Sequence, residues 1–600
     1  MTDAPSGRSW DQLGRRRFAA GVLASGGALF VVPGSTGLPA HAAQASSGGA
    51  PVLQRGSGSR AGLLEPHLRQ LVADAETFLG PSPKYPWYAG AVILAGRGRT
   101  VALERAIGKA VRYERYDEAT DTGVELPPEQ QVDMSMDTVF DLASVSKLFT
   151  SLLAVQQIER GALTLEAPVA SYLPEFGAAG KQDITILQLL THTSGFASWI
   201  PLYAEPTWEA KLARLWREAP VNPPGTTYLY SDLNLISLQL VLEKITGKSL
   251  DRLLADDITG PLGLDHTRYN PPASWLPRIA ATEDARKPWS GLDRGMVRGE
   301  VHDENAYSFG GVAGHAGLFS TAWDLAILCR TLLNGGAYGR TRILERESVE
   351  LMFTDFNTDF PGDEHGLGFE LYQHWFMGAM ATPESAGHTG FTGTALVVDP
   401  TTDTFLVLLG NSVHPVRSWR SGSAPRVAAG KNLARAVAVR PEDGRTAWFS
   451  GMANQKTSTL TLPEVTVRDA RAALEFALWW DTEPQWDKVY LEASADDGGT
   501  WEPVPFTSRR LRGGGVQQHA EGTADGWSGR VWHRASAELG TWRGRPVRLR
   551  WRYVTDRQYV GRGVYVDDVR VTDGHRVLFD DGRRGDAERV ELDGWAASAD

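Results

Sequence analysis

The chain has 600 residues, a formal net charge of −11 and one cysteine, Cys329. The modest negative charge argues against nucleic acid as a partner, because proteins that bind nucleic acid present basic surfaces. A single cysteine excludes an internal disulfide, so a hydrophobic core must hold the fold, and a chain of this length can bury one.

Residues 1–42 are predicted to be an export signal. Three arginines at positions 15–17 precede Phe18 and an apolar run, and Ala-His-Ala at 40–42 matches an A-x-A cleavage site. The paired arginines followed by phenylalanine resemble a twin-arginine export signal. The apolar run is shorter than the ~20 residues of a membrane span, and Gly, Ser and Pro interrupt it. We therefore expect a secreted, extracytoplasmic bacterial protein with no membrane span.

Residues 43–62 are rich in glycine and serine, which predicts a flexible linker. From residue 63 onward, helical and strand patterns alternate. Leucines at 64, 68 and 71 recur at helical spacing, and residues 89–108 are typical of a strand pair. Further along the chain, residues 395–409 contain two more strand-like runs around a turn, and residues 431–439 favour a closing helix. These patterns predict an α+β unit.

An S-x-x-K sequence, Ser144 to Lys147, precedes a predicted amphipathic helix in which apolar residues recur from Leu148 to Ile158. Ser144 then lies near the first turn, with Lys147 almost one turn further on the same face. A buried, partly deprotonated lysine could take the serine proton, and a helix N-terminus favours a developing oxyanion. The alternative is a capping serine followed by a solvated lysine.

Two later sequences favour the catalytic interpretation over the capping one: Tyr-Ser-Asp at 230–232 and His-Thr-Gly at 388–390. In this order after S-x-x-K, they resemble the motifs of the serine β-lactamase and penicillin-binding-protein superfamily. The resemblance covers residues 63–440 and is strongest to the branch of class C β-lactamases, D-aminopeptidases and related esterases. It implies a β-lactamase/transpeptidase-like fold, with an antiparallel sheet flanked by helices and a helical subdomain.

The resemblance also implies the roles of the site residues. Ser144 would be the nucleophile, Lys147 its base, and Tyr230 the group that relays the proton to the leaving group. The oxyanion would lie between the backbone N–H groups of Ser144 and Phe391. No metal or cofactor is implied. The residues that would bind substrate are Asp232, His388, Thr389, Gly390 and Phe391.

The chain departs from the family pattern twice. Asp232 stands where asparagine is usual, and His388 stands where the lactam-binding members have a lysine that helps to hold the ligand's carboxylate. His388 therefore favours an ester or amide substrate over a β-lactam. An ionised Asp232 would keep Lys147 protonated, which opposes its role as a base. Tyr228 competes with Tyr230 for the catalytic role, and only the family spacing favours Tyr230.

A second polar cluster, at residues 301–305, places His302 beside two carboxylates. A metal site would need a further ligand, such as a second helical histidine, and none lies at that spacing. We expect this segment to be a loop that lines the cleft of the serine. His192 and His315 are expected to be structural.

Residues 441–600 change in character, because strand alternation replaces the helical patterns. In residues 547–553, apolar side chains alternate with Arg548, Arg550 and Arg552, and glycine and aspartate turns separate the strands. This predicts an antiparallel β-sandwich with arginines on its solvated face. Residues 486–501 and 563–571 resemble the jelly-roll accessory domains of secreted proteases of the immune inhibitor A type. Their carboxylates, which could bind Ca²⁺ or could be ordinary turn aspartates, are Asp487, Asp567 and Asp568.

Together these observations predict a secreted serine hydrolase that cleaves ester or amide bonds. A cell-wall D,D-peptidase, D-aminopeptidase or β-lactamase is the first alternative, and a non-catalytic surface-binding protein is the second. The expected partners are a small-molecule or peptide-like substrate and, through the C-terminal domain, a cell-wall or surface polymer. Residues 63–440 contain every proposed catalytic group, so we expect that segment to fold and hydrolyse a small ester alone.

Overall fold

The computed structural model describes residues 49–287, 291–419 and 422–600. The predicted export signal at 1–42 lies outside the described residues. Within the described ranges, no helix combines the length and the apolar character that crossing a membrane requires.

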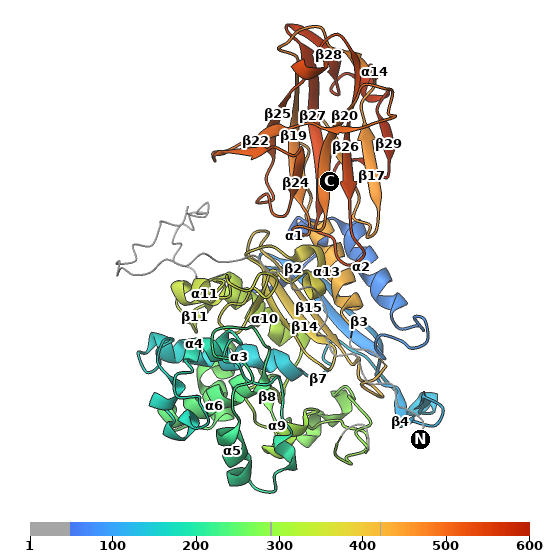
Figure 1. Ribbon diagram of the computed structural model, residues 1–600. Coiled ribbons are helices and arrows are strands. Elements are labelled where there is room, and N and C mark those ends of the chain that lie inside the picture. Colours follow the sequence, from blue (N-terminus) through green and yellow to red (C-terminus); the bar gives the residue numbers. More distant parts are fainter. Residues whose placement is uncertain (1–48, 288–290, 420–421) are drawn as a thin grey trace, which may run out of the picture. The chain divides into compact units, whose positions relative to one another are not determined.

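The first part of the chain is built on an eight-stranded sheet with the order β1-β3-β2-β15-β14-β13-β12, and β6 pairs with β3 (Figure 1). Only the β1–β3 pair is parallel. The strand pairs predicted at 89–108 and 395–409 are confirmed as β2–β3 and β14–β15. The strands are β1 (Gln54–Arg55), β2 (Gly90–Arg97), β3 (Thr100–Val111), β6 (Val132–Asp133), β12 (Glu370–Leu371), β13 (Ala386–Thr389), β14 (Thr394–Asp399) and β15 (Thr404–Gly410).

Both faces of this sheet are covered, so its central strands read as nearly continuous apolar runs. Within β2, Val92 and Leu94 join a core that includes α10 (Ala322–Leu333) and α3 (Ser146–Glu159). The residues between them, such as Ile93, join a second core on the opposite face. Two helices cover that second face, α2 (Glu65–Thr77) and α13 (Ala424–Ala436). The period-two alternation of a strand therefore divides one sheet between two cores.

Helix α3 is the centre of the helical subdomain, where it packs on α6 (Asp232–Thr246). The prediction that it is amphipathic was wrong: every residue from Ser146 to Gln157 is buried. The polar side chains on its outer stripe face other helices and loops instead of water. Gln156, for example, donates to the backbone carbonyls of Asp257 and Ile343. The helix that carries the predicted lysine is thus enclosed on all sides.

The linker prediction for residues 43–62 was wrong for the part that the structure describes, residues 49–62. Strand β1 pairs with β3, with Gln54 opposite Thr100, and Leu53 is buried. Helix α1 (Gly58–Ala61) follows, with Ser57 as its N-cap. These elements are two and four residues long, too short to produce a detectable period, so composition alone suggested a linker.

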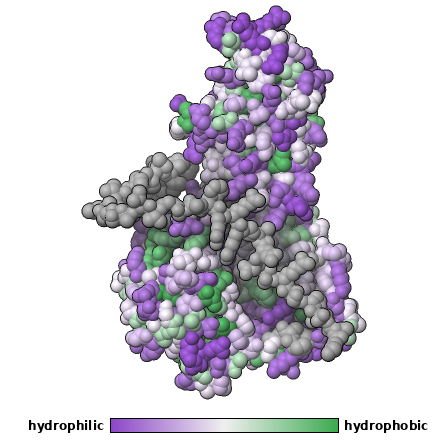
Figure 2. Space-filling view, viewed as in Figure 1, coloured by the Kyte–Doolittle hydropathy of each residue, from purple (hydrophilic) through white to green (hydrophobic). Residues whose placement is uncertain are grey.

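The second part of the chain is an antiparallel β-sandwich, as predicted. Its sheets have the orders β23-β22-β25-β19-β27-β16-β30 and β21-β20-β26-β17-β29, and their inner faces share one apolar core. On the face shown in Figure 2, hydrophilic residues predominate over this region. Its strands are β16 (Ala447–Phe449), β17 (Thr457–Thr461), β19 (Ala473–Asp481), β20 (Lys488–Ser494), β21 (Glu502–Pro503), β22 (Phe506–Arg510), β23 (Val516–His519), β25 (His533–Glu538), β26 (Pro546–Val554), β27 (Gly563–Asp573), β29 (Glu591–Asp593) and β30 (Ala596–Ser598).

The predicted arginine row of β26 is paired rather than merely solvated. Arg550 and Arg552 both bind Glu492 of the neighbouring strand β20, and Arg548 binds Glu591. Cross-strand pairs of opposite charge stabilise a sheet by roughly 0.2–1 kcal/mol each. The row therefore helps to fix the register of these strands.

The candidate calcium ligands separate into different surroundings. The Asp567 carboxylate accepts hydrogen bonds from three backbone N–H groups, and Asp568 pairs with Arg534, which are ordinary roles for turn aspartates. Asp487 instead lies with Glu483 and Asp556, in a group whose oxygens are all within 4.8 Å of one another.

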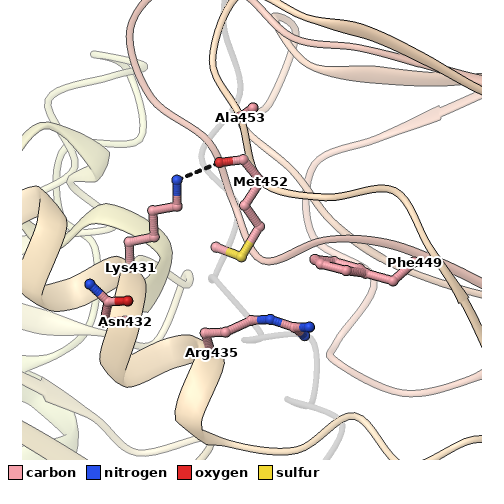
Figure 3. A pocket seen from close by; sticks show the side chains of 6 residues that line it. All are labelled: Lys431, Asn432, Arg435, Phe449, Met452 and Ala453. Atoms are coloured by element: carbon pink, nitrogen blue, oxygen red, sulfur yellow. Dashed lines mark hydrogen bonds between the residues drawn. The ribbon is translucent and has the colours of Figure 1, made fainter. Parts of the chain in front are cut away.

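The sheet core and the sandwich meet in one hydrophobic cluster. Phe449, Met452 and Tyr565 belong to the same core as helices α2 and α13. A cavity of about 320 Å³ lies between α13 and the strand that follows it (Figure 3). At its rim Lys431 donates to the backbone carbonyl of Met452 over 2.5 Å, and Arg435 lies over the ring of Phe449.

An arginine whose side chain is 10% exposed also joins the two parts. Arg530 donates to Asp399 at the end of β14 and to Asp481 at the end of β19, both over 2.9 Å, and to the backbone carbonyl of Ala379. Both carboxylates are fully buried. The independence of residues 63–440 stays a prediction, but removing the sandwich would expose part of this core and leave Asp399 without its cation. We therefore expect such a fragment to be less stable than the whole chain.

Replacing Arg530 with alanine should lower the free energy of unfolding by about 3–5 kcal/mol, because it leaves two buried carboxylates without a counter-charge. Denaturant unfolding of the full chain measures this. Arg570→Ala is the matched control, since Arg570 pairs with Asp580 while 47% exposed, and should cost at most about 1 kcal/mol. Equal losses in the two variants would contradict a joint role for Arg530.

Candidate active site

Ser144 lies in a tight turn, η2 (Ala143–Val145), that leads directly into α3. The preceding residue, Ala143, has φ of +46°, a left-handed conformation that is strained for a residue with a Cβ atom. Its N–H donates to Asp141 Oδ1 over 2.9 Å, which helps to hold the turn. Ser144 itself is only partly buried. The strained turn thus places Ser144, the predicted nucleophile, in a partly exposed position just before the buried helix α3.

Lys147 is 1% exposed, and its ammonium group lies among three acceptors. The Nζ atom is 2.8 Å from Ser144 Oγ, 3.2 Å from the carbonyl oxygen of His315 and 2.7 Å from Asp232 Oδ1. The predicted alternative of a solvated lysine is therefore wrong. Ser144, Lys147 and Asp232 are brought together, and the carbonyl of His315 joins them.

Tyr230 completes the group around Ser144. Its hydroxyl is hydrogen-bonded to Ser144, and its ring lies 4.8 Å from Lys147 Nζ. Burial, followed by the charge of Asp232, raises the pKa of Tyr230 well above its ordinary value, so the phenol stays protonated and can donate. Tyr228, the competing tyrosine, packs against the rings of His192 and His365 instead.

His192 holds the segment that carries Tyr230. Its Nδ1 accepts hydrogen bonds from the backbone N–H of Ser231 over 3.1 Å and from Asn234 Nδ2 over 3.0 Å, and its ring lies 4.5 Å from that of Tyr230. Burial lowers the pKa of His192 well below its ordinary value, which keeps Nδ1 free to accept. His192, which was expected to be structural, therefore holds in place the segment that carries Tyr230.

The segment that directly follows the third motif contacts the turn that carries Ser144 through two threonines. Thr392 Oγ1 donates to the carbonyl of Asp141 over 2.7 Å, and Thr394 Oγ1 donates to that of Leu142 over 2.9 Å. A Cβ atom on Gly390 would lie 2.3 Å from the Leu142 carbonyl oxygen, so only glycine fits there. Among the described residues, the N–H of Phe391 has no acceptor, as an oxyanion donor requires.

His388 lies beside this turn on β13, buried and with its ring 5.9 Å from that of Tyr230. Burial, followed by the charge of Lys147, lowers the pKa of His388 to about 3. The imidazole is therefore neutral at physiological pH, unlike the lysine that the family pattern has at this position. Thr389, the next residue, is partly exposed.

The segment at 301–305 faces the site, as expected, but its last two residues begin helix α9 (Glu304–Ser308) and do not continue a loop. The ring of His302 stacks on that of Phe391 at 5.7 Å. Asp303 binds His315 Nε2 over 2.8 Å and lies within 4.8 Å of the Asp232 carboxylate. Burial alone would raise the pKa of Asp303, but the charge of His315 holds this pKa below its usual range. Asp232 is already paired with Lys147, and Asp303 is paired with His315. The closeness of Asp232, Asp303 and His315 is therefore explained without a metal.

The assembled groups have the chemistry of acyl transfer. A hydroxyl nucleophile contacts an amine that can exchange its proton and a neutral phenol that can donate one. A free backbone N–H at Phe391 points to stabilisation of an oxyanion. All eight residues predicted for the site lie around Ser144 or on the adjoining strand and turn. Sequence analysis missed Glu370 of β12, which lies 3.9 Å from His388.

Comparisons with known proteins agree with this geometry. Residues 82–431 match the model of the family described as "Beta-lactamase", and residues 421–599 match that of the "Immune inhibitor A-like, MAM domain". Both predicted resemblances are thus confirmed, and with them the β-lactamase/transpeptidase-like fold of the first part of the chain.

The first part of the chain is also similar to curated relatives and to solved structures. A protein of Escherichia coli (strain K12), named "Putative D-alanyl-D-alanine carboxypeptidase", is 35% identical over 315 residues, which cover 48% of this chain and 72% of the relative. The hydrolase EstCE1 aligns at 22% identity with a TM-score of 0.48, over 62% of this chain and 98% of its own. A class C β-lactamase from Rhodobacter sphaeroides aligns at 21% with a TM-score of 0.45, over 61% and 98%.

We predict that Ser144→Ala abolishes covalent labelling by a fluorophosphonate probe and leaves the unfolding midpoint nearly unchanged, because Ser144 is partly exposed. Ser146→Ala is the matched control. Ser146 is fully buried and its hydroxyl accepts from the N–H of Leu318, so this variant should keep the label and lose about 1–3 kcal/mol of stability. Peptide mass spectrometry locates the adduct, and an adduct on Ser146 or Ser231 would sink the assignment.

The burial of His192 predicts a pH dependence of stability. Because its folded pKa is depressed, the unfolded chain binds the extra proton, so the contribution of His192 is present above about pH 6.5 and is lost on acidification. Each extra proton bound by the unfolded chain adds about 1.4 kcal/mol per pH unit to the slope of the unfolding free energy against pH. Urea unfolding at pH 7.5, 6 and 5 measures it.

Two variants isolate this contribution. Asparagine at position 192 keeps an acceptor and tolerates the left-handed φ of 56°, so His192→Asn should reduce the slope by about one proton with little loss at pH 7.5. His192→Ala leaves two donors without an acceptor and should cost about 1–3 kcal/mol at pH 7.5. A slope in His192→Asn equal to that of the wild type would rule out this role.

Proposed function

The chain belongs to the beta-lactamase family, and we propose that within it this protein is a secreted serine hydrolase that cleaves ester or amide bonds through an acyl-enzyme. The observation that carries the proposal is the pair of contacts at Ser144. Its Oγ lies 2.8 Å from Lys147 Nζ and is hydrogen-bonded to the neutral phenol of Tyr230. One hydroxyl thus has both a proton acceptor and a proton donor beside it.

Acylation begins when Ser144 Oγ attacks the carbonyl carbon and its proton passes to Lys147. An ammonium cannot accept that proton, so Lys147 must first release one. Asp232 Oδ1 lies 2.7 Å from Nζ and can hold that proton, which reconciles the ion pair with the base role of Lys147. Tyr230 then protonates the leaving group. Positioned acid and base groups of this kind contribute roughly 10²–10⁴-fold each.

The tetrahedral intermediate places negative charge on the former carbonyl oxygen. We assign its donors to the backbone N–H groups of Ser144 and Phe391. Loss of one such donor typically costs about 3–4 kcal/mol of transition-state stabilisation. Deacylation reverses the roles, because Tyr230 takes a proton from the attacking water and Lys147 returns one to Ser144.

The neutral ring of His388 supports an ester or amide substrate over a β-lactam. A β-lactam carries a carboxylate, which a permanently charged lysine can bind and a neutral imidazole cannot neutralise. A D-peptidase is the second candidate, and it is favoured by the name of the Escherichia coli relative.

Export through the twin-arginine route is part of the proposal and rests on residues 1–42 alone. The match of residues 421–599 to an Immune inhibitor A-like MAM domain supports a further part. We propose that the sandwich holds the enzyme near a cell-wall or surface polymer.

We expect a short-chain ester such as p-nitrophenyl butyrate to be turned over with a higher kcat/KM than benzylpenicillin. Steady-state assays with both compounds at pH 7.5 test this. Tyr230→Phe should lower kcat on the ester about 10²–10⁴-fold, because deacylation loses the group that takes a proton from the attacking water. Tyr228→Phe is the matched control, since Tyr228 does not contact Ser144, and should retain most of the activity. Efficient hydrolysis of penicillin by the unmodified enzyme would contradict the proposal.

A further inference from the structure

Helix α13 carries a buried arginine, Arg426, beside the turn that follows the third motif. Arg426 is 8% exposed, and its Nη2 atom donates to the carbonyl oxygen of Gly390 over 2.8 Å and to that of Thr394 over 3.1 Å. These two carbonyls lie at the two ends of the turn, which the N–H of Gly390 closes by donating to Thr394 over 2.8 Å. One guanidinium nitrogen therefore spans the base of the turn that carries Phe391.

The charge of Arg426 is not compensated by an ionised carboxylate. In the part of the chain that the structure describes, its hydrogen bonds go to backbone carbonyls, and the carboxyl group whose charge acts on it is that of Glu370. Burial raises the pKa of Glu370 to about 8, so this group is mostly protonated at pH 7.5. Burial lowers the pKa of Arg426 only to about 10, so the guanidinium stays charged. Because a buried charge without an ionised partner is unfavourable for folding, this arrangement indicates a role other than stability.

The carbonyl of Gly390 and the N–H of Phe391 belong to the same peptide unit. This peptide bond is trans, so the two groups point in opposite directions. Holding the carbonyl on the buried side therefore directs the N–H to the other side, where Phe391 is 52% exposed. A cation that is hydrogen-bonded to the carbonyl also draws electrons from the peptide unit, and hydrogen bonds in such a chain strengthen one another. The N–H of Phe391 thereby becomes a stronger donor.

The N–H of Phe391 is one of the two donors assigned above to the oxyanion. We propose that Arg426 is a positioning residue of the oxyanion site, which acts through the Gly390–Phe391 peptide to direct and strengthen the N–H of Phe391. Arg426 does not contact the substrate in this role, because the peptide unit lies between the guanidinium and the oxyanion. This inference rests on the proposed acyl-transfer function.

Both carbonyls keep a hydrogen bond when the guanidinium is removed. The N–H of Gly393 donates to the carbonyl of Gly390 over 3.0 Å, and the N–H of Gly390 donates to that of Thr394. Replacing buried charged groups with apolar side chains of similar volume is often neutral or stabilising. A purely structural Arg426 would therefore be needed for stability, whereas a positioning Arg426 would be needed for catalysis and not for stability.

The test compares full-length Arg426→Met and Arg426→Lys with the unmodified enzyme, on p-nitrophenyl butyrate at pH 7.5. Loss of a whole oxyanion donor lowers kcat about 10²–10³-fold, so weakening of one donor by Arg426→Met should lower kcat about tenfold, with KM changed less than about threefold. The midpoint of urea unfolding should not fall, because no carbonyl of the turn is left without a donor. Arg426→Lys keeps the charge and should be more active than Arg426→Met.

A transition-state analogue gives a readout that a structural role would not move. Butaneboronic acid forms a tetrahedral adduct with a serine hydroxyl, so its inhibition constant should rise in Arg426→Met by about the factor by which kcat/KM falls. Arg562→Met is the matched control. Arg562 is 1% exposed and also donates to a backbone carbonyl of α13, that of Ala434, so this variant should leave kcat and the inhibition constant unchanged.

Several outcomes would overturn the inference. These are an unchanged kcat in folded Arg426→Met, an inhibition constant that does not rise as kcat/KM falls, and an equal loss of activity in Arg562→Met. A lowered unfolding midpoint with an unchanged inhibition constant would show a structural role instead. If Arg426→Met does not fold, Arg426→Gln, which is polar but neutral, makes the same comparison with Arg426→Lys. Absence of ester turnover and of a Ser144 adduct in the unmodified enzyme would defeat the proposed function itself.

Discussion

The buried ammonium of Lys147 is the constraint on which the rest of the site depends. A charge that is 1% exposed must be paired, because an unpaired buried ion costs several kcal/mol. Its three acceptors come from three separate parts of the chain: the turn at Ser144, the start of α6 at Asp232, and the loop at His315. Satisfying this one cation therefore brings the nucleophile, the second motif and the loop at 301–315 to a single place.

Much of the site could be predicted because its groups are close in sequence or belong to a spaced set of motifs. Ser144 and Lys147 are three residues apart, so one helical turn brings them together. His192 and Glu370 could not be found in this way. His192 accepts a hydrogen bond from the backbone N–H of Ser231, the neighbour of Tyr230, across 39 residues, and Glu370 reaches His388 only through the register of two short strands. Nothing in local composition or periodicity indicates such contacts.

The errors in the fold have a related cause. Polar residues on α3 suggested a solvated stripe, but partners far away in the chain satisfy them, so the helix is buried throughout. Glycine and serine at 49–62 suggested a linker, but one buried leucine and a two-residue strand are enough to anchor that segment to β3. Patterns report local preferences reliably, whereas burial of a polar group depends on which distant group arrives to satisfy it.

Strand β14 gives the sandwich a physical connection to the chemistry. At its first residue, Thr394 donates to the Leu142 carbonyl, two residues before the nucleophile. At its last residue, Asp399 binds Arg530 of the sandwich. A strand in the middle of a sheet is stiff, and β14 is only six residues long, so a change in the pairing of Arg530 acts on the element that positions the turn of Ser144. The sandwich is therefore better described as a support of the hydrolase sheet that also presents an outer surface. An accessory module that only tethered the enzyme would need neither a shared core nor an arginine that pairs with two buried carboxylates at this junction.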